Sequence, residues 1–176
     1  MSSNKGVVIH VMGYYNSGKQ KLCDSLFETL LQQTNKNITY INDEVKKNLS
    51  YGLRYNLEDR KKQIERLGYI SYEIARNGGL IIFYSNYPYF RERDSIKKKL
   101  DIEGHLCVNV YLDTPLSVCK ERDETGIYLL AENGKLQNIP GVDEKYENPN
   151  DYDLILSDHD SNKHIEIIVK YIKDYI

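Results

Sequence analysis

A glycine-rich stretch close to the N-terminus has the residue types and spacing of a phosphate-binding loop. GYYNSGKQ, residues 13–20, follows the pattern G-x-x-x-x-G-K up to its last position. In such loops the backbone N–H groups surround phosphate oxygens, and the lysine lies against the terminal phosphates of a nucleotide donor. We therefore predict that ATP binds here and that Lys19 acts in catalysis. The loop residues predicted to bind ATP are Gly13, Tyr15, Asn16, Ser17, Gly18, Lys19 and Gln20.

Gln20 departs from the pattern, which has Ser or Thr at this position to bind Mg²⁺. The glutamine side chain also offers an oxygen, on a longer arm. Because Mg²⁺ keeps several waters and takes few protein ligands, this change weakens the placement of the metal without abolishing nucleotide binding. We predict that Gln20 is a metal ligand. The loop alone does not distinguish an active kinase from a nucleotide-binding module.

The segments on either side of the loop must position it. Residues 6–12, GVVIHVM, form an apolar, β-branched run that predicts a buried strand. Residues 18–33 carry leucines at helical spacing and predict an amphipathic helix. A strand before the loop and a helix after it are the context that a phosphate-binding loop requires. They argue against the alternative, an ordinary glycine turn with a solvated lysine.

Strands and helices alternate along the rest of the chain. Further strands are predicted at residues 37–41, 80–85, 105–113 and 153–157. Helices are predicted from the Asn56 cap to Gly78, from Phe90 to Leu100, after an N-cap at Thr114, and around Ile165–Ile172. This order predicts an α/β fold, the three-layer sandwich of P-loop NTPases, with a five-stranded parallel sheet and helices on both faces.

A segment near the C-terminal end of this pattern lacks clear periodicity. Residues 126–150 are rich in turn residues and too long for a passive connection. We predict that this part of the chain, about residues 125–150, is a lid or binding loop. With no internal repeat or linker elsewhere, the expected organisation is a single domain over residues 1–176.

Composition limits the partners and the compartment. The chain has 24 basic and 26 acidic residues and a net charge of -2, so no nucleic-acid partner is expected. Three widely spaced cysteines argue against a disulfide framework or a zinc site. We see no signal peptide and no apolar run of about 20 residues. We therefore expect a cytoplasmic protein without a membrane partner.

Several segments beyond the loop resemble the adenylylsulfate kinase family. The most similar is VYLDTPLSVCKERDETGIYLLAENGKLQNIPGVDEKYENP, residues 110–149, where the family reads D-T-P-L-x-V-C-x-x-R-D, then G-L-Y, then G-x-D-x-x-Y-E-x-P. NLEDRKKQIERLGYIS (56–71) and PYFRERD (88–94) also resemble family segments. The resemblance implies a small kinase that transfers the γ-phosphoryl group of ATP to the 3'-hydroxyl of adenosine 5'-phosphosulfate, with Mg²⁺ as cofactor. Members of this family are often homodimers.

The resemblance also implies roles for individual residues. Asp43, in YINDEVK, matches a carboxylate that faces the metal and the acceptor hydroxyl, where it is expected to act in catalysis. Arg122 matches a residue near the ATP base and the lid. Acceptor-binding positions of the family fall on Lys46, Tyr55, Arg60, Gln63, Tyr87 and Ile139.

Many of these positions differ from the family pattern. Lys46 replaces an arginine and loses its bidentate fork, while Ile41 replaces an aspartate and Phe90 an arginine. Lid positions that are cationic in the family are Leu129, Leu130, Glu132 and Gln137. Since phosphoryl transfer depends on neutralising charge, these losses favour an acceptor other than adenylylsulfate, such as the cytidine diphosphoramidate used by relatives in capsule synthesis.

Alternatives remain open from sequence alone. The same losses fit a non-catalytic nucleotide-binding or regulatory domain on the same fold. Asp43 could be a solvated turn carboxylate, Arg60 a surface ion pair and Tyr55 a core residue. Arg122 could be half of an ion pair at the end of a helix. Retention of the loop lysine, Asp43 and Arg60 favours the kinase.

Overall fold

A computed structural model gives the structure of the chain. Residues 5–54, 56–147, 152–157 and 160–176 are described, without the side chains of residues 90–93. The fold is built on a five-stranded sheet in the order β2-β3-β1-β4-β5, and every neighbouring pair is parallel. The strands are β1 (Val7–Met12), β2 (Ile38–Ile41), β3 (Leu80–Ser85), β4 (Leu106–Leu112) and β5 (Leu154–Leu156).

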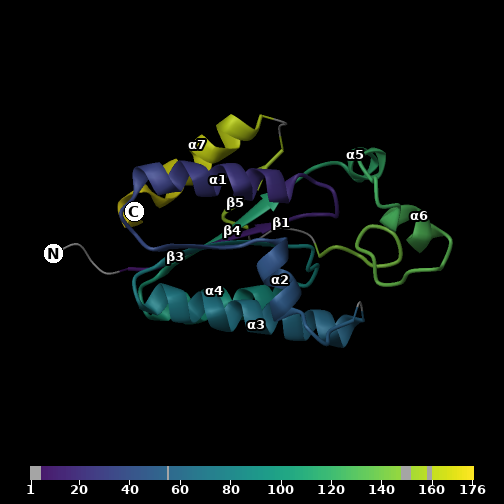
Figure 1. Cartoon of the computed structure of the whole chain (residues 1–176), viewed down its shortest axis with the longest axis horizontal. Helices are drawn as coiled ribbons and strands as arrows, with labels where there is room; N and C mark the ends of the chain where they lie inside the picture. Colours follow the sequence, from purple (N-terminus) through teal and green to yellow (C-terminus); the bar gives the residue numbers. More distant parts are fainter. Residues whose placement is uncertain (1–4, 55, 148–151, 158–159) are drawn as a thin grey trace.

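Helices cover both faces of this sheet (Figure 1). On one face lie α1 (Lys19–Gln33) and α7 (Ser161–Ile172), followed by a short 3₁₀ helix at Lys173–Tyr175. On the other lie α3 (Leu57–Arg76) and α4 (Phe90–Ile102), with α2 (Asp43–Leu49) beside them. The predicted three-layer α/β sandwich is confirmed.

The core lies in two layers because the sheet is covered on both sides. One apolar cluster joins the sheet to α1 and α7, and includes Leu26, Leu30 and Ile168. The other joins it to α3 and α4, and includes Ile64 and Leu67. Every residue of β1 is buried, which explains its continuous apolar run.

The segment after β4 forms a separate projection at one end of the sheet (Figure 1). It contains α5 (Leu116–Glu121) and α6 (Ile127–Glu132). It has a small apolar cluster of its own, whose fully buried members are Cys119 and Ile139. Of the segment predicted as a lid, about residues 125–150, the part described up to residue 147 contains α6 and the loop that follows it.

Several local predictions are confirmed and others are wrong. Asn56 caps α3 as predicted, and its side-chain oxygen accepts a hydrogen bond from the Asp59 amide at 2.9 Å. Thr114 does not cap α5, because Pro115 holds that position and the Thr114 hydroxyl instead donates to the Ser17 carbonyl. Helices α2 and α6 were not predicted, since each has only six or seven residues and shows no clear period.

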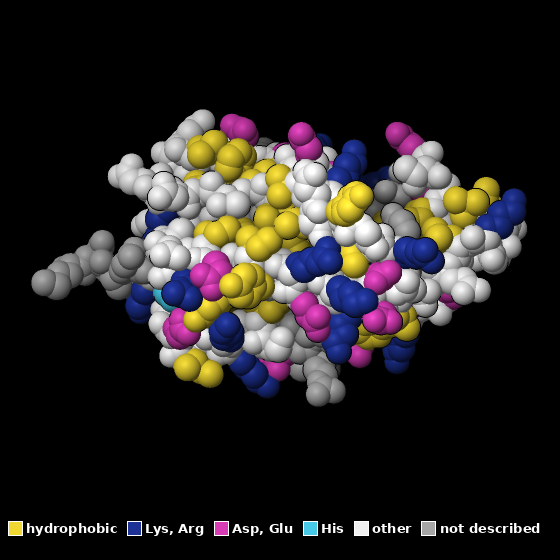
Figure 2. All heavy atoms as spheres, turned by 60° about the horizontal axis from the view of Figure 1, so that its bottom comes forward, with side chains coloured by type: hydrophobic (Ala, Val, Ile, Leu, Met, Phe, Trp, Pro, Cys, Tyr) yellow, Lys and Arg dark blue, Asp and Glu magenta, His cyan; other side chains and the backbone are white. Residues whose placement is uncertain are grey.

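Charged side chains are spread over the face of the molecule that Figure 2 shows. On this face several Lys and Arg side chains lie side by side near the middle of the view, with Asp and Glu side chains next to them (Figure 2). No helix in the described ranges is both long and apolar enough to cross a bilayer.

Candidate active site

The phosphate-binding loop connects β1 to α1. Gly13 has a φ of +151°, and a Cβ atom added to it would lie 2.8 Å from the Leu112 carbonyl oxygen. Only glycine fits this close approach of two backbone segments. Gly18 precedes the helix with a φ of +98°, and Asn16 also has a positive φ. The spacing of the two glycines thus follows from the shape of the loop.

The N-terminus of α1 is free to bind an anion. The first i to i+4 hydrogen bond of the helix runs from the Leu22 amide to the Gly18 carbonyl. The three preceding helical amides have no acceptor within the helix. In the described part of the chain, no side chain caps them. These donors and the positive end of the helix dipole fit phosphate oxygens.

Lys19 is a buried cation at this helix end. Its side chain contacts the Tyr14 carbonyl oxygen and lies 3.2 Å from Ser17 Oγ. Burial lowers the pKa of its amine to about 7. Among the described residues it forms no ion pair, its direct contacts are with neutral groups, and Asp43 adds only a weaker attraction from a distance. An anionic ligand would supply the missing compensation.

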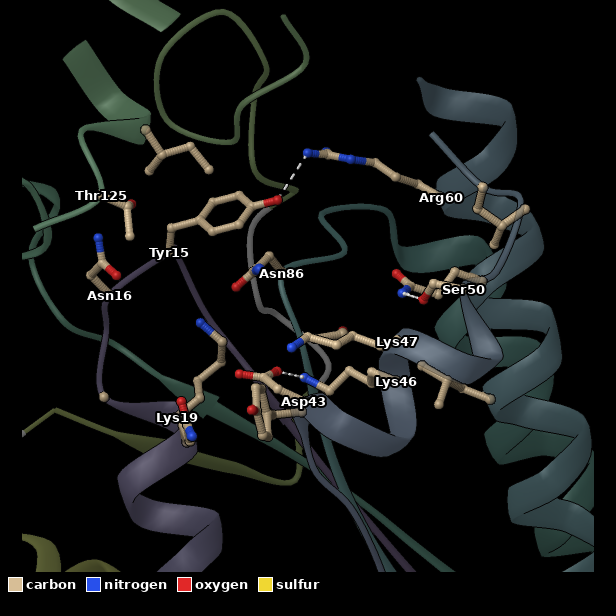
Figure 3. A pocket seen from close by; sticks show the side chains of 18 of the residues that line it. Tyr15, Asn16, Lys19, Asp43, Lys46, Lys47, Ser50, Arg60, Asn86 and Thr125 are labelled. Carbon is tan, nitrogen blue, oxygen red and sulfur yellow. Dashed lines mark hydrogen bonds and ion pairs between the residues drawn. The ribbon is translucent and has the colours of Figure 1, made fainter. Parts of the chain in front are cut away.

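A large cavity, of about 1290 Å³, opens in front of Lys19. Figure 3 shows side chains from the loop, α2, α3 and the lid pointing into it. The cavity brings together ten of the residues predicted from sequence: Tyr15, Asn16, Gly18, Lys19, Gln20, Asp43, Lys46, Arg60, Gln63 and Arg122. Residues more than 100 positions apart therefore meet at the carboxyl edge of the sheet, where α/β folds bind ligands.

Asp43 and Lys46 form a pair on the wall of the cavity. Asn42 caps α2, which places the two side chains one turn apart, with Lys46 Nζ 3.1 Å from Asp43 Oδ1. The lysine amine also lies 3.1 Å from the ring centre of Tyr84, at the end of β3. Burial alone would raise the pKa of Asp43, but Tyr84 and Lys46 outweigh it and lower this pKa. Asp43 is therefore an ionised carboxylate facing the cavity.

Arg60 is buried and held by two other elements. Its Nη1 atom lies 3.2 Å from Glu144 Oε2, and each side chain is only 9% exposed. Its Nη2 atom donates a hydrogen bond of 3.2 Å to the Tyr15 hydroxyl, from the phosphate-binding loop (Figure 3). The alternative of a surface ion pair is therefore wrong. Arg60 lines the cavity, whereas Glu144 stands behind it.

The remaining predicted residues take different positions. Tyr87 lines a smaller adjoining pocket together with Arg60 and Gln63. Gly13 and Ser17 lie in the loop but not on the cavity surface. Ile139 does not line the cavity in this structure, because it is fully buried in the apolar cluster of the lid. Tyr55 lies outside the described residues.

Sequence reasoning missed some residues of the site. Tyr84 and Asn86 line the cavity at the end of β3, and a search for polar residues at strand ends could have found them. Glu144 does not lie at a strand end and could not have been found in this way. It lies 84 residues from Arg60, and nothing in the pattern around it predicts an ion pair.

Gln20 and Asp43 could both contribute oxygens to a metal bound in the cavity. Among the residues that the structure describes, no group of three or more His, Cys, Asp or Glu side chains could hold a metal ion. A magnesium ion would therefore depend on phosphate oxygens and water for most of its ligands. That is the usual arrangement for Mg²⁺ bound with a nucleotide.

Comparisons with known proteins agree with this geometry. The family model for adenylylsulphate kinase matches residues 5–157. A sulfate adenylyltransferase of Aspergillus terreus is 33% identical over 155 residues, which are 88% of this chain and 27% of that protein. One of Neurospora crassa is 32% identical over the same share of both chains. The chain thus spans about a quarter of the length of these relatives.

A solved structure has the same fold. The Mycobacterium tuberculosis APS kinase CysC, in complex with AMPPNP and APS, superposes with a TM-score of 0.79 over 96% of this chain and 98% of that one, at 23% identity. At this identity the likeness concerns the fold, and the family model carries the assignment. The chain belongs to the adenylylsulphate kinase family.

Proposed function

We propose that this chain is a kinase that uses ATP and Mg²⁺ to phosphorylate the 3'-hydroxyl of a 5'-substituted nucleotide. The acceptor is adenylylsulfate or a changed nucleotide such as cytidine diphosphoramidate. One observation carries the proposal: the uncompensated Lys19 and the ionised Asp43 line the same cavity. A buried cation for the donor phosphates and a carboxylate for the acceptor are the two charges that such a transfer needs.

The donor end of the cavity supports the binding of a nucleotide triphosphate. The free amides of α1 would hold phosphate oxygens, and Lys19 would lie against the group to be transferred. Arg122 lines the same cavity from the end of α5, as expected of a residue beside the ATP base. Bound Mg²⁺ would neutralise charge on the phosphates, and Gln20 and Asp43 are the oxygen ligands within reach of the cavity.

The acceptor end supports a role for Asp43 in orienting the attacking hydroxyl. A carboxylate whose pKa is lowered is ionised at neutral pH and accepts a hydrogen bond from the attacking hydroxyl, which orients it. The nearby Lys46 fixes this carboxylate on α2. Arg60, Gln63 and Tyr87 would then contact the rest of the acceptor.

A non-catalytic nucleotide-binding domain is the second candidate. Gln20 in place of the metal-binding hydroxyl and the apolar lid residues Leu129 and Leu130 favour it. Both lid leucines are exposed, so they would not neutralise phosphate charge as cations would. Both candidates are expected to bind a nucleotide, but only the kinase is expected to transfer a phosphoryl group.

ADP release separates the two candidates. The protein is incubated with ATP, Mg²⁺ and each of a panel of 5'-substituted nucleotides, and ADP is followed over time. The kinase predicts ADP release that depends on one acceptor class and is lost in Asp43→Asn. Measurable nucleotide binding without any acceptor-dependent ADP would leave only the binding domain.

A further inference from the structure

The ion pair between Arg60 and Glu144 sets the charge of the acceptor end of the cavity. A guanidinium and a carboxylate at 3.2 Å, both largely shielded from water, attract each other much more strongly than a surface pair. A bound acceptor group that reaches Arg60 therefore meets a cation whose charge is already balanced.

Glu144 is held in place by the loop that carries it. The carboxylate of Asp143 accepts hydrogen bonds of 2.7 Å from the amides of Asn138 and Ile139. The Gly141 amide donates to the Glu144 carbonyl at 2.8 Å. A Cβ on Gly141 would lie 2.9 Å from the ring of Tyr14, so the loop packs tightly on the phosphate-binding loop. The carboxylate is thus preorganised against Arg60.

A second cation at this end, Lys46, also has a carboxylate partner, but in a more exposed pair, since the Asp43 side chain is 59% exposed. Lys46 is paired with Asp43, whereas Lys19 at the donor end has no carboxylate partner among the described residues. Lys47 and Arg54 also line the cavity from exposed positions, whereas the less exposed Arg60 and Lys46 carry their counter-charges within the protein. Such a site attracts an anion less strongly than one with free cations.

We infer that Glu144 is a positioning residue that neutralises Arg60 and thereby lowers the preference of the acceptor subsite for an anionic 5'-substituent. Glu144 acts through Arg60, because of these two residues only Arg60 lines the cavity. This inference deepens the proposed function and rests on its acceptor site. It assigns the chemical class of the acceptor by charge, and it leaves the base unspecified.

Binding of a matched pair of ligands tests the inference. The dissociation constants of a nucleoside and its 5'-monophosphate are measured with the phosphate-binding loop filled by a non-hydrolysable ATP analogue and Mg²⁺. Their ratio reports the preference for a 5' anion. Glu144→Gln leaves Arg60 unpaired, so it should shift the ratio at least about tenfold toward the monophosphate, the size of one charge-assisted contact. If Glu144 had only a structural role, Glu144→Gln would weaken the binding of both ligands by the same factor and leave the ratio unchanged.

Matched variants sharpen the result. Glu121→Gln removes the same charge from an exposed position outside the cavity and should leave the ratio within about twofold. In an Arg60→Gln background, Glu144→Gln should no longer shift the ratio. If Glu144→Gln does not fold, Glu144→Asp draws the carboxylate back from Arg60 and should shift the ratio in the same direction by a smaller factor.

Two outcomes overturn the inference: an unchanged ratio in Glu144→Gln, or a shift away from the monophosphate, which would mean that Glu144 orients Arg60 toward an anion. ADP release tests the proposed kinase separately. A shifted ratio without ADP release keeps the inference and removes the kinase. ADP release with an unshifted ratio keeps the kinase and removes the inference.

Discussion

The cations at the two ends of the cavity have different surroundings. At the donor end, Lys19 is buried against neutral groups, and its pKa falls to about 7. At the acceptor end, Arg60 and Lys46 each lie within hydrogen-bonding distance of a carboxylate. A buried charge without a partner is costly, so the donor end gains most from an anionic ligand. At the acceptor end the charges of Arg60 and Lys46 are already paired, so an anionic ligand stabilises this end less.

This difference suggests how one scaffold can keep its donor while changing its acceptor. The phosphate-binding loop depends on backbone geometry, which tolerates little change. The acceptor end depends on side chains, and a single carboxylate from the lid alters its charge. The predictions that follow test whether the two ends really differ in this way.

The largest effect should come from breaking the buried ion pair. Glu144→Gln should lower the free energy of unfolding by about 3 kcal/mol, because it leaves a buried guanidinium without its counter-charge. Chemical denaturation measures this, with Glu121→Gln as the exposed control expected to change stability by less than about 0.5 kcal/mol. Equal effects of the two variants would show that the pair is not energetically distinct.

Removing the unpaired cation should have the opposite effect on stability. Lys19→Met should weaken ATP binding by about 10²–10³-fold, since the phosphates lose their buried cation. The unliganded protein should become more stable, because no amine has to be desolvated. Titration with ATP and chemical denaturation measure the two quantities, and Lys170→Met on α7 serves as an exposed control. Loss of stability in Lys19→Met would contradict the comparison between the two ends.

The loop backbone should tolerate substitution less than other glycine turns. Gly13→Ala places a Cβ against the Leu112 carbonyl, whereas Gly104→Ala, also at positive φ, meets no atom within 4 Å. We expect Gly13→Ala to cost about 2–3 kcal/mol and Gly104→Ala about 1 kcal/mol, because only the first adds a clash to the strain. Comparable denaturation midpoints for the two variants would refute this assignment.

The affinity for Mg-ATP should fall as the pH rises above 7. The amine of Lys19 in the free protein has a pKa of about 7, and bound phosphates raise it. Binding therefore takes up a proton between the two pKa values, and the dissociation constant should rise by up to about tenfold per pH unit there. Titrations from pH 6 to 9 measure the slope, which should disappear in Lys19→Met.

The same pKa predicts how stability depends on pH without nucleotide. Between pH 7 and about 10.5, the amine is protonated when unfolded and largely neutral when folded. Since the unfolded chain binds more protons there, the contribution of Lys19 to stability rises with pH across this interval. Denaturation at several pH values should show this rise in the native sequence and its absence in Lys19→Met.

The smallest expected effect concerns the metal. Gln20→Ser restores the short hydroxyl ligand and should raise turnover, or lower the Mg²⁺ concentration needed, by a few fold. ADP release at several Mg²⁺ concentrations measures both. If neither changes, the metal is held without this position, and the difference at Gln20 has no bearing on the reaction.

The sequence alone determined the donor half of this site. The phosphate-binding loop is a local motif between a strand and a helix, so its spacing predicted the glycines, the lysine and the helix end together. The alternation of strands and helices likewise predicted the parallel sheet, because apolar periodicity follows burial directly. Short helices such as α2 were not predicted, because one or two turns are too few to show a helical period in the sequence.

Only the tertiary structure decided the acceptor half. Arg60 could be identified by resemblance, but its partner Glu144 lies 84 residues away and reaches it through the fold of the lid. Ile139 occupies a predicted binding position yet packs inside the lid, because its contacts depend on how α6 and the following loop fold. Charge balance in a cavity is a property of side chains brought together in space, and no local pattern in the sequence records it.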